Sequence, residues 1–119
     1  MMMRALVEIP LADACTTTAI RCADGIHTEA VRIFKAGAKT GYHAHAYDHT
    51  TVIVRGSVEA FADGEPLGRF GEMESLLIRA GALHQFTALE DDTTFVCVHN
   101  VSRTGDIDTV GDFAMKDFR

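Results

Sequence analysis

The chain has 119 residues, of which 47% are hydrophobic and 24% are charged. This composition is typical of one folded globular domain, and it excludes wholesale disorder and a division into two independent domains. The formal net charge is −6, from 11 basic and 17 acidic residues spread along the chain, which argues against a surface for nucleic acid.

Neither the apolar runs nor the cysteines indicate a membrane or an oxidising compartment. The longest apolar run, Val52 to Val54 with its neighbours, stops at Arg55 and is far shorter than the ~20 residues that span a bilayer. Residues 1–12 show no export signal, and the three cysteines form no CxxC pair. We therefore expect a cytoplasmic protein with reduced thiols, and a disulfide between Cys15 and Cys22 is the alternative.

Along the chain, the pattern after residue 27 is one of short strands. Segments rich in β-branched or aromatic residues alternate with glycine-containing turns, and no long window carries a helical stripe. Asp63-Gly64 is the best hairpin turn, because both residues tolerate a positive φ. The predicted strands are Thr28–Lys35, Asp48–Arg55, Ser57–Ala62, Ser75–Ile78, His84–Leu89 and Thr93–Val101.

Strands this short must form a sandwich or a small barrel, because their edges otherwise stay unpaired. The sequence thus predicts an all-β fold. Residues 1–27 are predicted as an N-terminal arm with strands, 28–104 as the barrel, and 105–119 as an acidic C-terminal tail. An exposed sheet edge would favour a homodimer, unless the two terminal segments cover the edges.

Four of the six histidines fall in two clusters, at positions 43–49 and 84. On an extended strand, His43 and His45 project from the same face with Cβ atoms about 6 to 7 Å apart, near enough to bind one ion. His49 has the same parity and can face the same interior after a bend through residues 46–48. One divalent cation would satisfy a nitrogen on each buried ring, whereas an exposed, solvated cluster is the alternative.

The glycines around these histidines complete a longer pattern. Residues 37–56 read Gly, five residues, HxH, three residues, His, six residues, Gly, which resembles the first cupin motif. The segment RAGALH at 79–84 resembles the second motif. The resemblance covers about residues 28–100 and implies a jelly-roll β-barrel, or double-stranded β-helix, with one metal ion inside. The metal ligands that it implies are His43, His45, His49 and His84.

The chain departs from the cupin pattern at four positions. His49 stands where the family usually has Glu, Arg79 where it has Pro, Met73 where it has Gly, and Ala88 where it has Asn. Four neutral imidazoles would leave the ion its full charge, which should attract carboxylates, enolates or thiolates. If His49 instead bends outward, three ligands remain. Iron, zinc, nickel, manganese and copper all suit such ligands, and the sequence does not choose among them.

Several other side chains are candidates for the same pocket. Cys97 and His99 share one face of their predicted strand, so that His99 is a candidate general base and Cys97 a wall of the pocket. Tyr47 either orients a substrate or faces solvent in a turn, and Asp48 is a candidate hydrogen-bond acceptor for a ligand histidine. His27 lies outside both clusters and carries no signal.

The resemblance implies a metal-binding cupin that acts on a small anionic or chelating molecule. A dioxygenase that cleaves a chelating substrate is the first reading. The alternatives are a metal-dependent isomerase or lyase, in which His99 moves the proton, and a non-enzymatic cupin that binds or senses a ligand. The fold does not decide among these classes.

Overall fold

The structure is a computed structural model that describes residues 9–12, 15–23 and 25–100. Every regular element in these ranges is a β-strand, which confirms the all-β prediction. None of the described residues forms a helix that could cross a membrane. The strands are β1 (Ile9–Ala12), β2 (Cys15–Ala23), β3 (Ile26–Ile33), β4 (His49–Arg55), β5 (Ser57–Ala62), β6 (Glu65–Gly71), β7 (Ser75–Ile78), β8 (His84–Ala88) and β9 (Thr93–Asn100).

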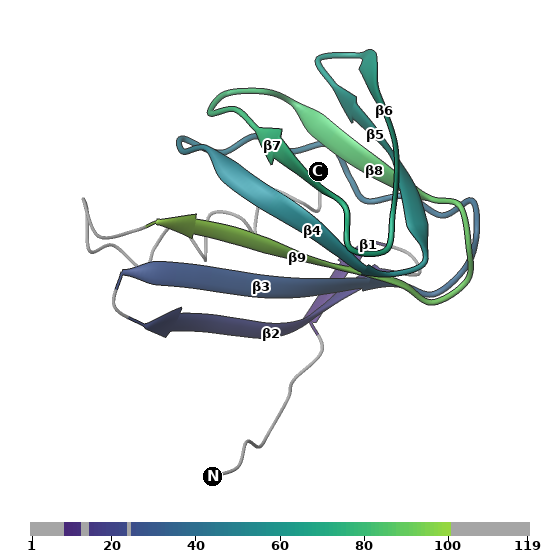
Figure 1. Ribbon diagram of the computed structural model, residues 1–119, viewed down its shortest axis with the longest axis horizontal. Helices are drawn as coiled ribbons and strands as arrows, with labels where there is room; N and C mark the ends of the chain where they lie inside the picture. Colours follow the sequence, from purple (N-terminus) through teal and green to yellow (C-terminus); the bar gives the residue numbers. More distant parts are fainter. Residues whose placement is uncertain (1–8, 13–14, 24, 101–119) are drawn as a thin grey trace, which may run out of the picture.

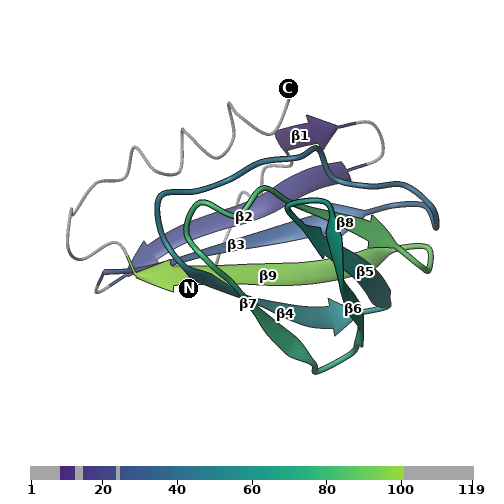
Figure 2. The same ribbon diagram turned by 90° about the horizontal axis from the view of Figure 1, so that it is seen from above.

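The strands form two antiparallel sheets in the manner of a jelly roll. The larger sheet has the order β1-β2-β3-β9-β4-β7 and the smaller has the order β6-β5-β8. In Figure 1, β2, β3 and β9 run side by side in the lower layer, with β5, β6 and β8 above them. The view from above in Figure 2 shows the strands of the smaller sheet crossing over the larger one. Distant parts of the chain therefore meet between the sheets.

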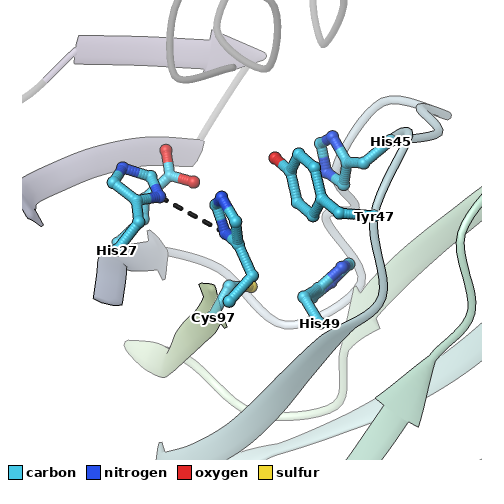
Figure 3. A pocket seen from close by; sticks show the side chains of 7 residues that line it. His27, His45, Tyr47, His49 and Cys97 are labelled. Carbon is cyan, nitrogen blue, oxygen red and sulfur yellow. Dashed lines mark hydrogen bonds between the residues drawn. The ribbon is translucent and has the colours of Figure 1, made fainter. Parts of the chain in front are cut away.

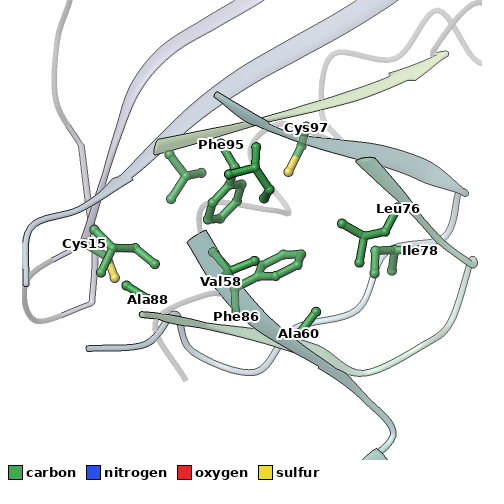
Figure 4. Packing of buried hydrophobic residues seen from close by; sticks show 12 residues of the cluster. Cys15, Val58, Ala60, Leu76, Ile78, Phe86, Ala88, Phe95 and Cys97 are labelled. Carbon is green, nitrogen blue, oxygen red and sulfur yellow. The ribbon is translucent and has the colours of Figure 1, made fainter. Parts of the chain in front are cut away.

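The core lies between the two sheets and follows from the alternation of side chains along each strand. In β9, every second residue from Thr93 to His99 is buried, as the predicted parity of Cys97 and His99 requires. The two largest buried rings, Phe86 and Phe95, come from opposite sheets and lie 4.7 Å apart between centroids. Figure 4 shows both rings in the apolar cluster. Apolar side chains from both sheets thus pack against one another in the interior.

The segment that carries the HxH pair differs from its predicted form. Residues 36–48 contain no regular strand, and His43 forms only an isolated bridge with His84. The segment nevertheless runs beside β8, because Thr40 N–H donates to Phe86 C=O at 2.9 Å and His84 N–H donates to His43 C=O at 2.9 Å. These backbone hydrogen bonds replace those of a regular strand, and they fix His43 directly against His84.

The predicted hairpin turn is confirmed, and one strand beside it was missed. Asp63 and Gly64 have φ values of 53° and 81° and join β5 to β6. Strand β6 was missed because Pro66 and Gly68 weaken its sequence pattern. The strand lies at the edge of the smaller sheet, where a proline without an N–H is tolerated.

Gly56, between β4 and β5, lets the backbone approach Thr93 more closely than a residue with a Cβ could. Its φ is +80°, and an added Cβ would collide with Oγ1 of Thr93 and lie 3.0 Å from the Thr93 Cα. We expect Gly56→Ala to lower the free energy of unfolding by about 2 kcal/mol or more, from strain and collision together. Urea unfolding measures the change, and Gly64→Ala, where a Cβ meets nothing within 4 Å, separates the cost of φ alone. Equal losses in both variants would contradict the collision.

The N-terminal segment takes part in the larger sheet. Strand β2 pairs along β3, with Cys15 opposite Ile33 and Cys22 opposite His27. Because Cys15 and Cys22 lie near opposite ends of one strand, their Cα atoms are separated by about 20 Å, which is too far for a disulfide. Cys15 is buried and free. The predicted tail at 105–119 lies outside the described residues, and the domain boundaries stay a prediction.

Candidate metal centre

Three histidine rings converge in the interior beside the apolar cluster, where the centroid of the His84 ring lies 5.9 Å from that of Phe86. One ring nitrogen from each of His43, His45 and His84 lies within 4.8 Å of one from each of the others. The ring centroids are 4.2 Å apart for His43 and His84, and 5.0 Å apart for His43 and His45. All three side chains are buried. Small rotations of the rings would bring the three nitrogens to the distance of about 2.1 Å at which imidazole binds a transition metal.

Backbone carbonyls fix the tautomers of two of these rings. Nδ1 of His43 donates to the Gly41 carbonyl at 3.1 Å, and Nδ1 of His84 donates to the Ala82 carbonyl at 3.0 Å. A carbonyl only accepts, so each Nδ1 carries the hydrogen and each Nε2 keeps its lone pair. The Nε2 of His84 is buried and has no hydrogen-bond partner among the described residues. A bound cation would satisfy this atom, so the donor set fits a metal ion.

His49 is the fourth ring of the cluster, but its nitrogens lie outside the group of three. Its centroid is 5.0 Å from that of His84 and 5.2 Å from that of His45. The ring is buried at the start of β4, and within the described part of the chain neither of its nitrogens has a hydrogen-bond partner. His49 therefore faces the interior and not the solvent. Whether it binds the ion stays a prediction, as does the full set of four ligands.

The buried rings are held neutral, which is the form that binds metal. Burial lowers the pKa of His43 to about 4, and the hydrogen bond to Gly41 offsets this in part. Burial, with repulsion from neighbouring histidines, lowers the pKa of His49 and of His84 to about 3. Burial and the charges of the other rings also lower the pKa of His45. All four rings are therefore unprotonated, and so neutral, at pH 7.

A small pocket adjoins the cluster and contains residues that sequence reasoning did not connect. Figure 3 shows Tyr47 lying against His45, with His27 across the pocket. The cavity volume is about 10 Å³, room for roughly one water molecule. The lining side chains come from β3, β4, β9 and the 36–48 segment. They are His27, Glu29, His45, Tyr47, His49, Cys97 and His99.

Tyr47 and His99 take clear positions in this pocket. Tyr47 is half-buried and stacks on His99 at 3.7 Å and on His45 at 4.9 Å between ring centroids. The solvent-facing alternative for Tyr47 is therefore wrong. His99 is buried, and Cys97 beside it forms part of the wall, with its Sγ 3.4 Å from the hydroxyl of Thr51. A catalytic role for His99 stays a prediction.

Asp48 links two loops through a hydrogen bond and an ion pair. Its carboxylate accepts from the Ala80 backbone N–H at 2.7 Å and lies 4.0 Å from the Arg79 guanidinium. Asp48 therefore joins the HxH segment to the turn before β8. Arg79, which stands in the place of the proline of the second cupin motif, is the partner of Asp48 in this ion pair. The expected hydrogen bond from a ligand histidine to Asp48 stays a prediction.

The sequence offers no reason to assign His27 a role, but in the structure His27 lines the pocket. It is 2% exposed and stands directly opposite His99 in the register of β3 and β9. Glu29, two positions along the same face, is also buried in the pocket. The sequence feature that could have indicated this position is that His27 and Glu29 lie on the same face of β3. This shared face points to the pocket only once the pairing of β3 with β9 is known.

The metal-free protein should lose stability as the pH falls from about 6.5 to 4. The ordinary histidine pKa is about 6.5, and the pKa of His43 is about 4 in the folded chain, so between these values the unfolded chain binds more protons. The stabilisation is therefore complete above pH 6.5 and lost on acidification, by on the order of 1 to 2 kcal/mol per buried histidine at pH 5. Urea midpoints of chelator-treated protein at pH 7.5 and pH 5 measure it, and His49→Asn should lessen the difference. Equal midpoints for the wild type would contradict the burial of neutral rings.

Comparison with known proteins identifies the class of fold. No protein-family model matches the sequence, and no curated protein matches it. Solved structures do match, and with the two sheets and the histidine cluster they show that this chain has the cupin fold.

Several of the matching structures cover most of both chains. KdgF from Halomonas sp. is 18% identical, with a TM-score of 0.69 over 80% of this chain and 86% of that chain. An RmlC-like cupin from Shewanella frigidimarina is 13% identical, with a TM-score of 0.68 over 84% of this chain and 87% of that chain. A variant of the oxalate decarboxylase of Bacillus subtilis is 18% identical, with a TM-score of 0.65, and the match covers 74% of this chain and 26% of that chain. At these identities the likeness concerns the fold alone.

Proposed function

We propose that this chain is a metal-binding cupin that acts on a small anionic or chelating molecule. The observation that carries the proposal is the buried Nε2 of His84, which has no hydrogen-bond partner among the described residues and lies among the rings of His43 and His45. A buried polar atom without a partner is costly unless a ligand satisfies it. The neutral imidazoles around it are ligands for a divalent transition metal, of which zinc, iron, nickel, manganese and copper are the candidates.

The charge of the donor set supports an anionic substrate. All four rings of the cluster are neutral at pH 7, so a divalent ion bound there would keep its charge and polarise an oxygen or sulfur of the substrate. The substrate would enter beside His45 and His49, which line both the cluster and the pocket. Since the cavity has a volume of only about 10 Å³, the side chains that line it would have to move before a larger molecule could bind.

His99 favours a lyase or isomerase among the enzymatic alternatives. It lies in the pocket next to His45 and His49, and burial lowers its pKa to about 4, so it is an unprotonated base at neutral pH. Such a base can take a proton from a substrate whose negative charge the ion stabilises. The names of two matching structures, a DMSP lyase from Ruegeria pomeroyi and oxalate decarboxylase, support bond cleavage on this fold. A dioxygenase, which was the first reading of the sequence, becomes the second candidate, and a site of neutral histidines also suits oxygen chemistry at iron.

Metal analysis of protein purified without an affinity tag tests the proposal. We expect about one transition-metal ion per chain. A panel of small carboxylates, in H2O and in D2O, then separates the reactions. Incorporation of deuterium or loss of a leaving group without oxygen consumption supports the lyase or isomerase, and oxygen uptake supports the dioxygenase. Metal binding without turnover would leave the non-enzymatic reading, and absence of metal would refute the proposal.

The variant His49→Ala distinguishes three ligands from four. If His49 binds the ion, we expect the variant to lose metal affinity by about tenfold to a hundredfold or more, since a neutral donor is removed. Titration of the metal-free protein with zinc against a fluorescent chelator measures the affinity. Thr50→Ala, an exposed neighbour on β4, is the control. An unchanged affinity in His49→Ala would show that three histidines hold the metal.

A further inference from the structure

Across the pocket from the metal ligands, two histidines from neighbouring strands face each other. His27 on β3 and His99 on β9 are directly opposite in register, and their Nδ1 atoms are 3.4 Å apart. The rings meet edge to face, with centroids 4.6 Å apart and an angle of 64°. Both are buried, at 2% and 6% exposure. Neither Nε2 has a hydrogen-bond partner among the described residues.

The contact between the two Nδ1 atoms constrains where the protons lie. A neutral imidazole has one N–H and one bare nitrogen, and a hydrogen bond between two Nδ1 atoms needs one of each. One ring must therefore carry its proton on Nδ1 and have a bare Nε2, while the other has a bare Nδ1 and carries its proton on Nε2. The pair thus presents an acceptor on the outer nitrogen of one ring and a donor on the outer nitrogen of the other, and the contact between the Nδ1 atoms joins the two.

We propose that His27 and His99 share one proton between their Nδ1 atoms and act as a proton relay, in which His27 is the positioning residue that sets the tautomer of His99. The catalytic part of this inference rests on the proposed function, whereas the shared proton does not. Tyr47 stacks on the His99 ring with an interplanar angle of 13°, so the plane of that ring is held from the side of the metal cluster as well.

The relay conserves protons and charge. His99 receives a substrate proton at its bare Nε2, while the electron pair of the broken bond stays on the substrate. The Nδ1 proton of His99 passes to Nδ1 of His27, so His99 stays neutral and His27 becomes an imidazolium. Glu29 is buried two positions from His27 on the same face of β3 and lines the same pocket as the ring that would carry this positive charge. The reverse transfer returns the proton to the product.

Nuclear magnetic resonance of ¹⁵N-histidine in the zinc-loaded protein tests the shared proton without any substrate. We expect one ring of the pair to show a protonated Nδ1 with a bare Nε2, and the other ring to show the opposite. If the proton hops rapidly, both rings show averaged shifts. His27→Asn, whose amide can still bond to His99, should keep a single tautomer there, and His27→Phe should change the His99 shifts. Both rings with a bare Nδ1, or unchanged His99 shifts in His27→Phe, would overturn the proposal.

Metal content separates this inference from the proposed function. Neither His27 variant should change the amount of zinc bound, because His27 lies across the pocket from the metal ligands (Figure 3). If the wild type bound no metal, the proposed function would fail, and the same spectra of the metal-free protein would still decide whether the two rings share a proton. With a substrate from the carboxylate panel, His27→Phe should lower kcat by about a hundredfold at an unchanged KM, and His27→Asn much less. Equal losses in both variants, or a change in KM alone, would exclude the relay.

Discussion

Replacement of His84 by alanine should abolish metal binding. Its Nε2 is buried, is held in the bare tautomer by the Ala82 carbonyl, and has no hydrogen-bond partner among the described residues. Its backbone also anchors the HxH segment through the hydrogen bonds with His43. We expect the metal content to fall from about one ion per chain to below about a tenth, measured by elemental analysis of tag-free protein.

The fold should survive this change. Alanine keeps the backbone hydrogen bonds of β8, and the cluster loses a polar ring and not an apolar one. Circular dichroism should therefore be unchanged, with Thr50→Ala, which is exposed on β4, as the matched control. Full metal content in a folded His84→Ala protein would show that the ion binds elsewhere.

Truncation of Phe86 to alanine should cause the largest loss of stability. This ring is 1% exposed, and its centroid lies 4.7 Å from that of Phe95 in the other sheet and 5.9 Å from that of His84. Removal of a buried phenylalanine ring costs about 3 to 5 kcal/mol, because apolar burial is lost and a cavity remains. We expect the midpoint of thermal unfolding of the metal-free protein to fall by about 10 to 20 °C.

A second truncation serves as the control. Leu77 on β7 is 50% exposed, so Leu77→Ala should cost less than about 1 kcal/mol. Both variants are compared by calorimetry in the presence of a chelator, so that metal release does not contribute. Similar losses for Phe86→Ala and Leu77→Ala would contradict a core located between the two sheets.

Most of the β body could be predicted from its local pattern. The strands at Ser57–Ala62 and Ser75–Ile78 were predicted to the residue, and β9 covers Thr93–Asn100 of the predicted strand at 93–101. Alternation and turn residues are local signals, so they need no knowledge of the fold. Strand β6 escaped because Pro66 and Gly68 are tolerated only at a sheet edge, and edge position is not a local property. The bounds of β1 and β2 were not predicted, because the sequence pattern of the N-terminal segment is irregular.

The histidine cluster was predicted from spacing, but its geometry was not. The HxH pair was assigned to a strand, whereas the structure holds it in a segment that takes its hydrogen bonds from β8. The carbonyls of Gly41 and Ala82, which set the tautomers, depend on backbone positions that a sequence does not reveal. His27 was missed because its place in the pocket depends on the register between β3 and β9.

The homodimer that the sequence favours stays a prediction.

Diffraction from crystals of tag-free protein, measured at the absorption edge of the bound metal, tests the central claim most directly. The account predicts one anomalous peak per chain, about 2.1 Å from ring nitrogens of His43, His45 and His84. The same map shows whether His49 is a fourth ligand. A peak at any other place in the chain, or no peak among these three rings in metal-replete protein, would contradict it.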